Sequence, residues 1–139
     1  MKYLQISQIL KTNEIFKSIQ EKHPSFTIDL EVFSCKSSKN DKIFNTLPKP
    51  FRYLVQTLAL AYPDYDFENE NALSFTLMPY QDVVNELILI IDKTVRLDKC
   101  EIFSYKNRSG PFENCKWYFC FFFYCKNEKR ILMLNLRSL

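Results

Sequence analysis

Three carboxylates stand two residues apart in the stretch PDYDFE, at Asp64, Asp66 and Glu68. Carboxylates at this spacing bind Mg²⁺ when they share one face at the end of a strand. Here they follow an apolar helical stretch that ends at Pro63, and no nucleophile, base or further ligand accompanies them. The pattern favours a structured loop or a recognition surface over a metal-dependent enzyme. We therefore assign no catalytic residue, no metal ligand and no cofactor.

Histidine, cysteine and glycine offer little more chemistry. His23 has no second histidine with which to bind zinc, and Gly110, the single glycine, cannot build a phosphate-binding loop. No two of the five cysteines form a CxxC pair, and the opening MKYLQISQILK lacks the apolar segment of a secretory signal. We expect reduced thiols that serve as small buried hydrophobes. The cysteines are Cys35, Cys100, Cys115, Cys120 and Cys125.

Basic side chains gather in two places, although the net charge of +3 is too small to require nucleic acid as a partner. One group lies in the predicted turn KNEKR, at Lys126, Lys129 and Arg130. The other lies in a polar linker at 36–50. Two interpretations stay open: solvated turn residues, or an electrostatic surface for a partner. The basic residues of the linker, with Arg52 two positions beyond its end, are Lys36, Lys39, Lys42, Lys49 and Arg52.

Hydrophobic periodicity predicts the elements that position these groups. A helix over 12–22 carries Ile15, Phe16 and Ile19 at helical spacing, and the alternating FTIDLEVF predicts a half-buried strand over 26–33. Two further helices and a closing antiparallel meander follow the linker. The remaining predicted elements are a short strand at 2–6, helices at 51–62 and 79–97, and strands at 100–105, 117–125 and 130–137.

The strand WYFCFFFYC, residues 117–125, is apolar on both faces and too short for a transmembrane helix. We expect it in the middle of a sheet that is covered on both sides. A base-stacking platform is the alternative, but it needs a bare aromatic face, a basic surround and a glycine-rich motif that is missing. The four side chains expected in the structural core on one face are Trp117, Phe119, Phe121 and Phe123.

These elements predict an α+β fold: one globular domain over 1–139, with a central antiparallel sheet of about four to five strands flanked by about three α-helices. We expect a monomer that does not associate with a membrane.

Several stretches, in order, resemble the Maf-one family, the eukaryotic repressors of RNA polymerase III transcription. They are VFSCK, then FRYLVQTLALAYPDYDF, then CEIFSY, a PF turn, an aromatic strand begun by Trp117, a K-x-x-K-R turn and an apolar strand that ends in RS. The resemblance covers nearly the whole chain. It implies an antiparallel sheet flanked by helices, and a protein that is not an enzyme.

The resemblance also implies how the protein acts. Family members bind RNA polymerase III near its clamp and block its engagement with the promoter-bound initiation factor TFIIIB, which lowers tRNA and 5S RNA synthesis. Asp64, Tyr65 and Asp66 match the family's acidic signature, and Lys129 and Arg130 match its basic hairpin. We expect these five residues to contact the partner. TFIIIB components, kinases and phosphatases are further expected partners, in nucleus and cytoplasm.

Two departures make this a short form of the family pattern. The polar linker at 36–50 replaces a long mobile insertion, and the acidic tail of many relatives is absent. Ser34, Ser37 and Ser38 are candidate phosphorylation sites beside the lysines of the linker. The alternative function is an RNA- or DNA-binding module that uses the basic linker and hairpin, although the resemblance leads us not to expect direct nucleic-acid binding. Salt distinguishes the two, because phosphate contacts weaken steeply as salt rises.

Overall fold

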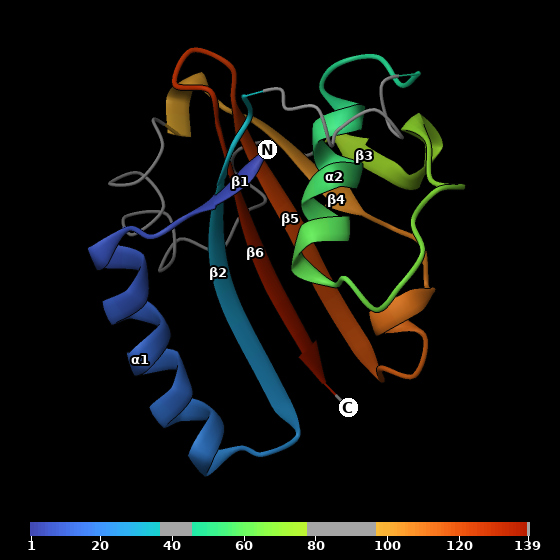
Figure 1. Cartoon of the computed structure of the whole chain (residues 1–139). Helices are drawn as coiled ribbons and strands as arrows, with labels where there is room; N and C mark the ends of the chain where they lie inside the picture. Colours follow the sequence, from blue (N-terminus) through green and yellow to red (C-terminus); the bar gives the residue numbers. More distant parts are fainter. Residues whose placement is uncertain (37–45, 78–96, 139) are drawn as a thin grey trace.

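The computed structural model describes residues 1–36, 46–77 and 97–138, and these build one six-stranded antiparallel sheet with α-helices beside it (Figure 1). The order of the strands is β1-β2-β6-β5-β4-β3. The predicted α+β class is confirmed. The strands are β1 (Lys2–Leu4), β2 (Phe26–Ser34), β3 (Phe75–Leu77), β4 (Glu101–Tyr105), β5 (Trp117–Cys125) and β6 (Arg130–Ser138), and the helices are α1 (Ser7–Lys22) and α2 (Phe51–Ala61).

The sheet has one strand more than the upper predicted number. The unpredicted strand is β3, which pairs with β4 from Phe75 opposite Tyr105 to Leu77 opposite Phe103. Three residues are too few to produce a recognisable alternation, so the sequence pattern could not reveal it. The predicted helix at 79–97 lies outside the described residues except for its last position, and so do residues 37–45 of the predicted linker.

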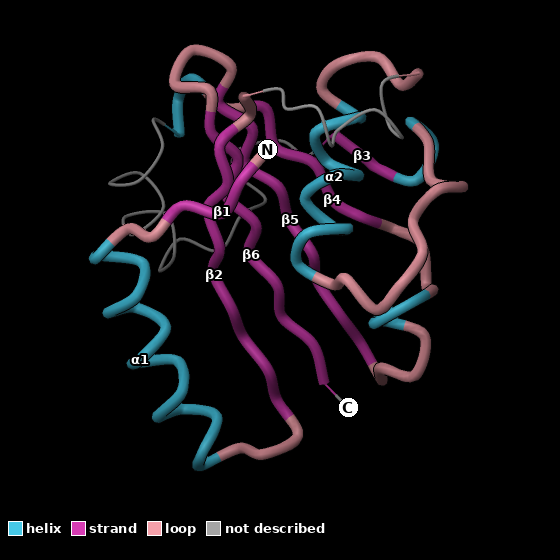
Figure 2. Tube along the Cα trace, viewed as in Figure 1, coloured by secondary structure: helices cyan, strands magenta, loops and turns pink. Residues whose placement is uncertain are grey.

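The aromatic strand β5 lies between β6 and β4, as its apolar faces predicted (Figure 2). It pairs along its whole length with β6, from Trp117 opposite Ser138 to Cys125 opposite Arg130. Helix α2 covers one face, where Leu54, Val55 and Leu58 join a core with Cys120, Phe122 and Tyr124. Side chains of this kind stabilise a fold by about 1.5–3 kcal/mol each when fully buried.

The opposite face of β5 corrects the predicted core. Phe121 and Phe123 are buried there, but Trp117 is 39% exposed and Phe119 is 52% exposed. Alternation along the strand does place all four on one face. However, the apolar cluster of this face surrounds Phe121 and Phe123, where Ile9 and Phe16 of α1 pack. The beginning of the strand lies away from that cluster, so Trp117 and Phe119 are surface residues.

Helix α1 begins at Ser7, five positions before the predicted start at 12, and runs beside the outer edge of β2 (Figure 1). The Asn13 side chain donates to the Leu30 carbonyl (2.8 Å) and accepts from the Leu30 N–H (3.0 Å), so it pairs with this edge as a neighbouring strand would. This contact protects an edge that would otherwise invite aggregation. Ile15, predicted on the apolar face, is 62% exposed, because the buried stripe instead passes through Ile9, Thr12 and Phe16.

None of the five cysteines forms a disulfide in the structure; four are buried and Cys100 is half-buried. The expectation that the cysteines are buried is therefore confirmed for Cys35, Cys115, Cys120 and Cys125. Among the helices that the structure describes, none has both the length and the apolar character required to cross a membrane.

Candidate functional site

The two groups of predicted partner-binding residues lie at opposite ends of β5 (Figure 1). The acidic loop, residues 62–70, connects through Tyr62 and Phe112 to Tyr118 near the beginning of the strand. The basic hairpin, residues 126–130, follows Cys125 at its other end. Seven residue steps of about 3.3 Å separate Tyr118 from Cys125, which is about 23 Å. The structure therefore forms two separate surfaces from these residues.

The acidic loop begins where α2 ends, and its own polar groups hold it. The Tyr65 N–H donates to the Tyr62 carbonyl (3.1 Å), and the Glu68 N–H donates to Oδ1 of Asp66 (2.9 Å). A carboxylate that accepts the N–H two residues later is a common way to close a turn. Phe67 points into the core and is buried. Asp66 thus has a structural role, because its carboxylate closes a turn of the acidic loop.

Glu70 attaches the end of the acidic loop to the last residue of β4 and to the region that follows it. Its carboxylate accepts from the Tyr105 hydroxyl (2.9 Å) and from Nδ2 of Asn107. Asn107 Nδ2 also donates to Oγ of Ser74 (3.1 Å). Sequence analysis did not select Glu70, because nothing in its local pattern indicates partners more than thirty residues away.

Tyr65 is the exposed aromatic residue of the acidic loop, at 47% exposure. Its ring lies edge-to-face with Tyr62, at 6.4 Å between centroids. It also covers Gly110, whose φ of +58° suits glycine and where an added Cβ would lie 3.4 Å from the ring. The guanidinium of Arg137 lies 5.7 Å from the Tyr62 ring centre and donates to the Pro111 carbonyl (3.2 Å). Asp64, Tyr65 and Asp66 are exposed to solvent, on a loop that these contacts hold in place.

The basic hairpin is a tight turn that is bonded to the end of β2. Lys129 adopts a left-handed conformation, with φ of 52°, and its N–H donates to the Lys126 carbonyl (3.2 Å). Its carbonyl accepts from the Cys35 N–H (2.8 Å). Arg130 begins β6 opposite Cys125 and Ser34. The hairpin and the end of β2 therefore keep a defined relative position.

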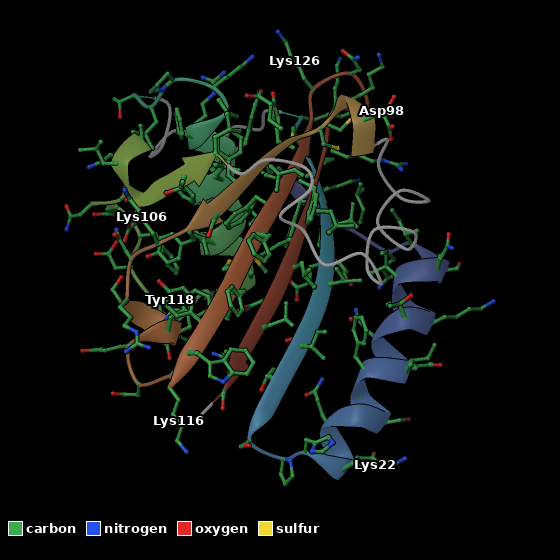
Figure 3. All side chains as sticks on the ribbon, turned by 180° about the vertical axis from the view of Figure 1, so that it is seen from behind. Lys22, Asp98, Lys106, Lys116, Tyr118 and Lys126 are labelled. Atoms are coloured by element: carbon green, nitrogen blue, oxygen red, sulfur yellow. The ribbon has the colours of Figure 1, made fainter. Side chains whose placement is uncertain are left out.

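A cleft of about 410 Å³ opens between the basic hairpin, the end of β2 and the beginning of α2. We call it the basic cleft. Figure 3 shows the Lys126 side chain at this end of the molecule and Lys116 at the other end of β5. Four of the seven lining residues are lysines, all exposed. The lining residues are Cys35, Lys36, Lys49, Tyr53, Tyr124, Lys126 and Lys129.

Two stacked tyrosines form the aromatic wall of the basic cleft. Tyr53 and Tyr124 lie with ring centroids 5.8 Å apart. The Lys49 ammonium and the Arg52 guanidinium lie 5.8 Å and 5.3 Å from the Tyr53 ring centre. Cations at this distance from an aromatic face are attracted by the ring quadrupole. Sequence analysis identified the lysines of linker and hairpin but could not predict that they meet, and it missed both tyrosines.

Two further titratable groups of the basic cleft, Tyr124 and Cys35, are neutral near pH 7. Burial raises the pKa of Tyr124 to about 12, with smaller contributions from Cys35, Tyr53 and Glu101, while Arg52 acts in the opposite direction. Burial likewise raises the pKa of the Cys35 thiol to about 12, against the effect of the N-terminal ammonium. None of the described residues that line the cleft carries a carboxylate. The charge of its lining is therefore that of its lysines.

Of the three candidate phosphorylation sites, the structure describes only Ser34. Ser34 is only 7% exposed and lies within β2, opposite Lys2 and Arg130 of its neighbouring strands. A kinase cannot reach its hydroxyl while the sheet is intact, so this prediction is corrected. Ser37 and Ser38 lie outside the described residues. Among the described residues, no group of three or more His, Cys, Asp or Glu is arranged to hold a metal ion.

The fold defines the class to which this protein belongs. Two crystal structures of citrus MAF1 superpose with TM-scores of 0.66 and 0.67, at 25% and 27% sequence identity. Both matches cover 82% of this chain, and they cover 86% and 87% of the citrus chains. Residues 44–135 match the family model described as Maf1 regulator. The chain belongs to the Maf1 family, as the Maf-one resemblance predicted.

Curated relatives extend this finding. Two uncharacterised proteins of Encephalitozoon cuniculi are each 38% identical over 156 aligned positions, covering 97% of this chain and 96% of theirs. The repressor of RNA polymerase III transcription maf1 of Schizosaccharomyces pombe is 31% identical over 113 positions, covering 66% of this chain and 48% of its own length. The repressor of RNA polymerase III transcription of Dictyostelium discoideum is 31% identical over 116 positions, covering 67% and 42%.

Proposed function

We propose that this protein is a negative regulator of RNA polymerase III transcription. It binds the polymerase in the clamp region and blocks its recruitment to promoter-bound TFIIIB, which lowers tRNA and 5S RNA synthesis. The observation that carries the proposal is the Maf1 family match over residues 44–135, together with relatives named as repressors of this polymerase. The action is steric, so it requires a surface and no catalytic group.

The two ends of β5 supply the contacts in this proposal. Lys129 and Arg130 of the basic hairpin face acidic polymerase surface, and Asp64, Tyr65 and Asp66 of the acidic loop make a second contact. A standard protein interface buries about 800 Å² per partner, which is large enough to reach both ends of a strand of this length. Charge complementarity of this kind sets orientation and association rate more than total affinity.

Regulation and location are part of the same proposal. The protein acts as a monomer in nucleus and cytoplasm, TFIIIB components are further partners, and kinases and phosphatases control it through Ser37 and Ser38. Ser34 is left out because it is buried.

The test is binding of the purified chain to purified RNA polymerase III at near-physiological salt, with RNA polymerase II as the control. We expect selective binding and suppression of promoter-dependent initiation. Lys129→Glu and Asp64→Lys should each weaken binding about tenfold, since a charge contact at an interface contributes about 1.4 kcal/mol or more. Lys22→Glu, on the exposed end of α1, is the matched control. Absence of binding by a folded sample contradicts the proposal.

A second candidate function, RNA or DNA binding, is favoured by the four lysines of the basic cleft and by the exposed rings of Trp117 and Phe119. Exposed aromatic side chains stack bases, and lysines contact phosphates. Fluorescence anisotropy of a labelled single-stranded RNA at 50 and 200 mM salt distinguishes the functions. Tight binding that falls steeply with salt supports the nucleic-acid function, whereas weak binding with intact polymerase binding supports the repressor.

A further inference from the structure

We propose that the basic cleft is a binding site for a compact polyphosphate anion, the chemistry shared by inorganic triphosphate and the phosphate chain of a nucleoside triphosphate. This inference goes beyond the proposed repressor function and does not depend on it. It rests on the geometry, the charge and the aromatic wall of the cleft.

Three segments that are distant in the sequence bring their lysines to one cleft. Lys36 follows β2, Lys49 precedes α2, and Lys126 and Lys129 belong to the basic hairpin. The Cys35 N–H bond to the Lys129 carbonyl joins β2 to the hairpin at 2.8 Å. The volume of about 410 Å³ falls in the usual range of small-molecule sites, roughly 300–1,000 Å³.

The charge of the lining matches an anion that carries several negative charges. Four of the lining residues are lysines, and lysine binds phosphate as a compact point charge with three donors. Helix α2 begins at this end with no acidic residue in its first turn and no side-chain cap, so its N-terminus adds positive partial charge. Glu128 lies within the hairpin but is not among the lining residues. A single phosphate would neutralise only part of this charge.

The aromatic wall excludes recognition of a base. Tyr53 and Tyr124 are 6% and 5% exposed, and Lys49 and Arg52 lie over the Tyr53 ring. The rings therefore offer no open face on which a base could stack. The Tyr124 hydroxyl remains protonated at neutral pH, because burial raises its pKa to about 12, and it can donate to a phosphate oxygen. Binding should depend on the phosphate chain alone.

Isothermal titration calorimetry of the whole chain at near-physiological salt tests the site. The probes are inorganic triphosphate, ATP without metal, and orthophosphate. We expect one saturable site for triphosphate, ATP binding within about threefold of it, and orthophosphate weaker by at least tenfold. ATP that binds far more tightly than triphosphate would show that the base is recognised and would overturn the proposal as stated.

Matched variants separate the cleft from general electrostatic attraction. Lys36→Gln and Lys126→Gln each remove one charge from different walls of the cleft, and each should weaken triphosphate binding about tenfold. Lys116→Gln and Lys22→Gln remove the same charge from exposed sites elsewhere and should change binding less than twofold. Equal losses in all four variants, or equal binding of an oligoglutamate of the same charge, would overturn the proposal. Circular dichroism and thermal melting confirm that each variant is folded.

The outcome is independent of the polymerase assay. If triphosphate does not bind but the chain binds RNA polymerase III, only this inference fails. If triphosphate binds and the polymerase does not, the repressor function fails and the anion site stands.

Discussion

The two ends of β5 use their charged residues in different ways. At the Tyr118 end, the carboxylates of Asp66 and Glu70 accept hydrogen bonds that close the acidic loop and attach it near β4. At the Cys125 end, four exposed lysines surround a cleft whose described lining includes no carboxylate. The difference shows that a charged stretch can be structural or can form a surface, and that the sequence pattern alone does not distinguish them.

The physical reason lies in the backbone. A chain that leaves a helix and turns sharply has N–H groups without helical partners, and a buried or half-buried donor without a partner is costly. Aspartate and glutamate accept such bonds with short side chains. Lysine has three donors and a long flexible stem, so it extends into solvent from a turn and remains available to an external anion.

The largest expected effect tests how much the aromatic side chains at the Tyr118 end of β5 contribute to the stability of the fold. Phe112 is fully buried, and its ring stacks on Tyr118 at 4.6 Å and meets Tyr62 edge-to-face at 5.8 Å. Phe112→Ala should destabilise the fold by about 3–5 kcal/mol through lost contacts and a cavity. Tyr65→Ala, at an exposed ring of the same end, should cost less than about 1 kcal/mol. Guanidinium unfolding measures both, and equal losses would contradict the assignment of Tyr65 to the surface.

Removing the hydrogen bonds of Glu70, at the same end of β5, should have a smaller effect on stability. Glu70→Ala removes the acceptor for the Tyr105 hydroxyl and for Asn107 Nδ2. We expect a loss of about 1–3 kcal/mol in the free energy of unfolding, since two donors each lose the charged one of their two acceptors. Glu68→Ala, an exposed carboxylate in the same loop, should stay within about 0.5 kcal/mol. A neutral Glu70→Ala result would mean that these two hydrogen bonds contribute little to the stability of the fold.

Alkaline pH should lower the free energy of unfolding through two buried groups at the Cys125 end of β5. Burial raises the pKa of Cys35 from 9.0 to about 12 and that of Tyr124 from 10.0 to about 12. Between pH 9 and pH 12 the unfolded chain therefore holds fewer protons than the folded chain, so the free energy of unfolding falls as pH rises. Urea midpoints at pH 7, 9, 10 and 11 measure this decline. Cys35→Ala should make it shallower from pH 9 upward, and an unchanged slope would contradict the role of this thiol.

The smallest expected effect on stability comes from a substitution at Lys129 in the basic hairpin, which should change binding but not folding. Lys129 has a φ of 52°, a conformation that glycine adopts without a steric cost. Lys129→Gly should leave stability unchanged within about 1 kcal/mol or raise it slightly. The same variant loses a cleft charge and should bind triphosphate and polymerase more weakly. A variant that unfolds would instead indicate that the lysine side chain supports the turn.

Much of the fold could be predicted from local sequence. The apolar run Trp117–Cys125, bounded by Lys116 and Lys126, predicted β5 with the bounds that the structure has. The alternation of FTIDLEVF predicted β2, and Pro63 correctly limited α2, which ends at Ala61. The three residues of β3 and the first five residues of α1 were missed, because such short stretches carry no measurable period.

The sequence by itself determined the class of fold, the central place of β5 and the family, because periodicity and motif order are properties of neighbouring residues. Only the tertiary structure decided which apolar side chains are covered, so that Phe123 is core while Phe119 is surface. It also decided that Lys36, Lys49 and Lys129 share one cleft while Asp66 closes a turn. Burial and charge clustering depend on contacts between residues that are distant in the chain. A local sequence pattern does not indicate which distant residues come into contact.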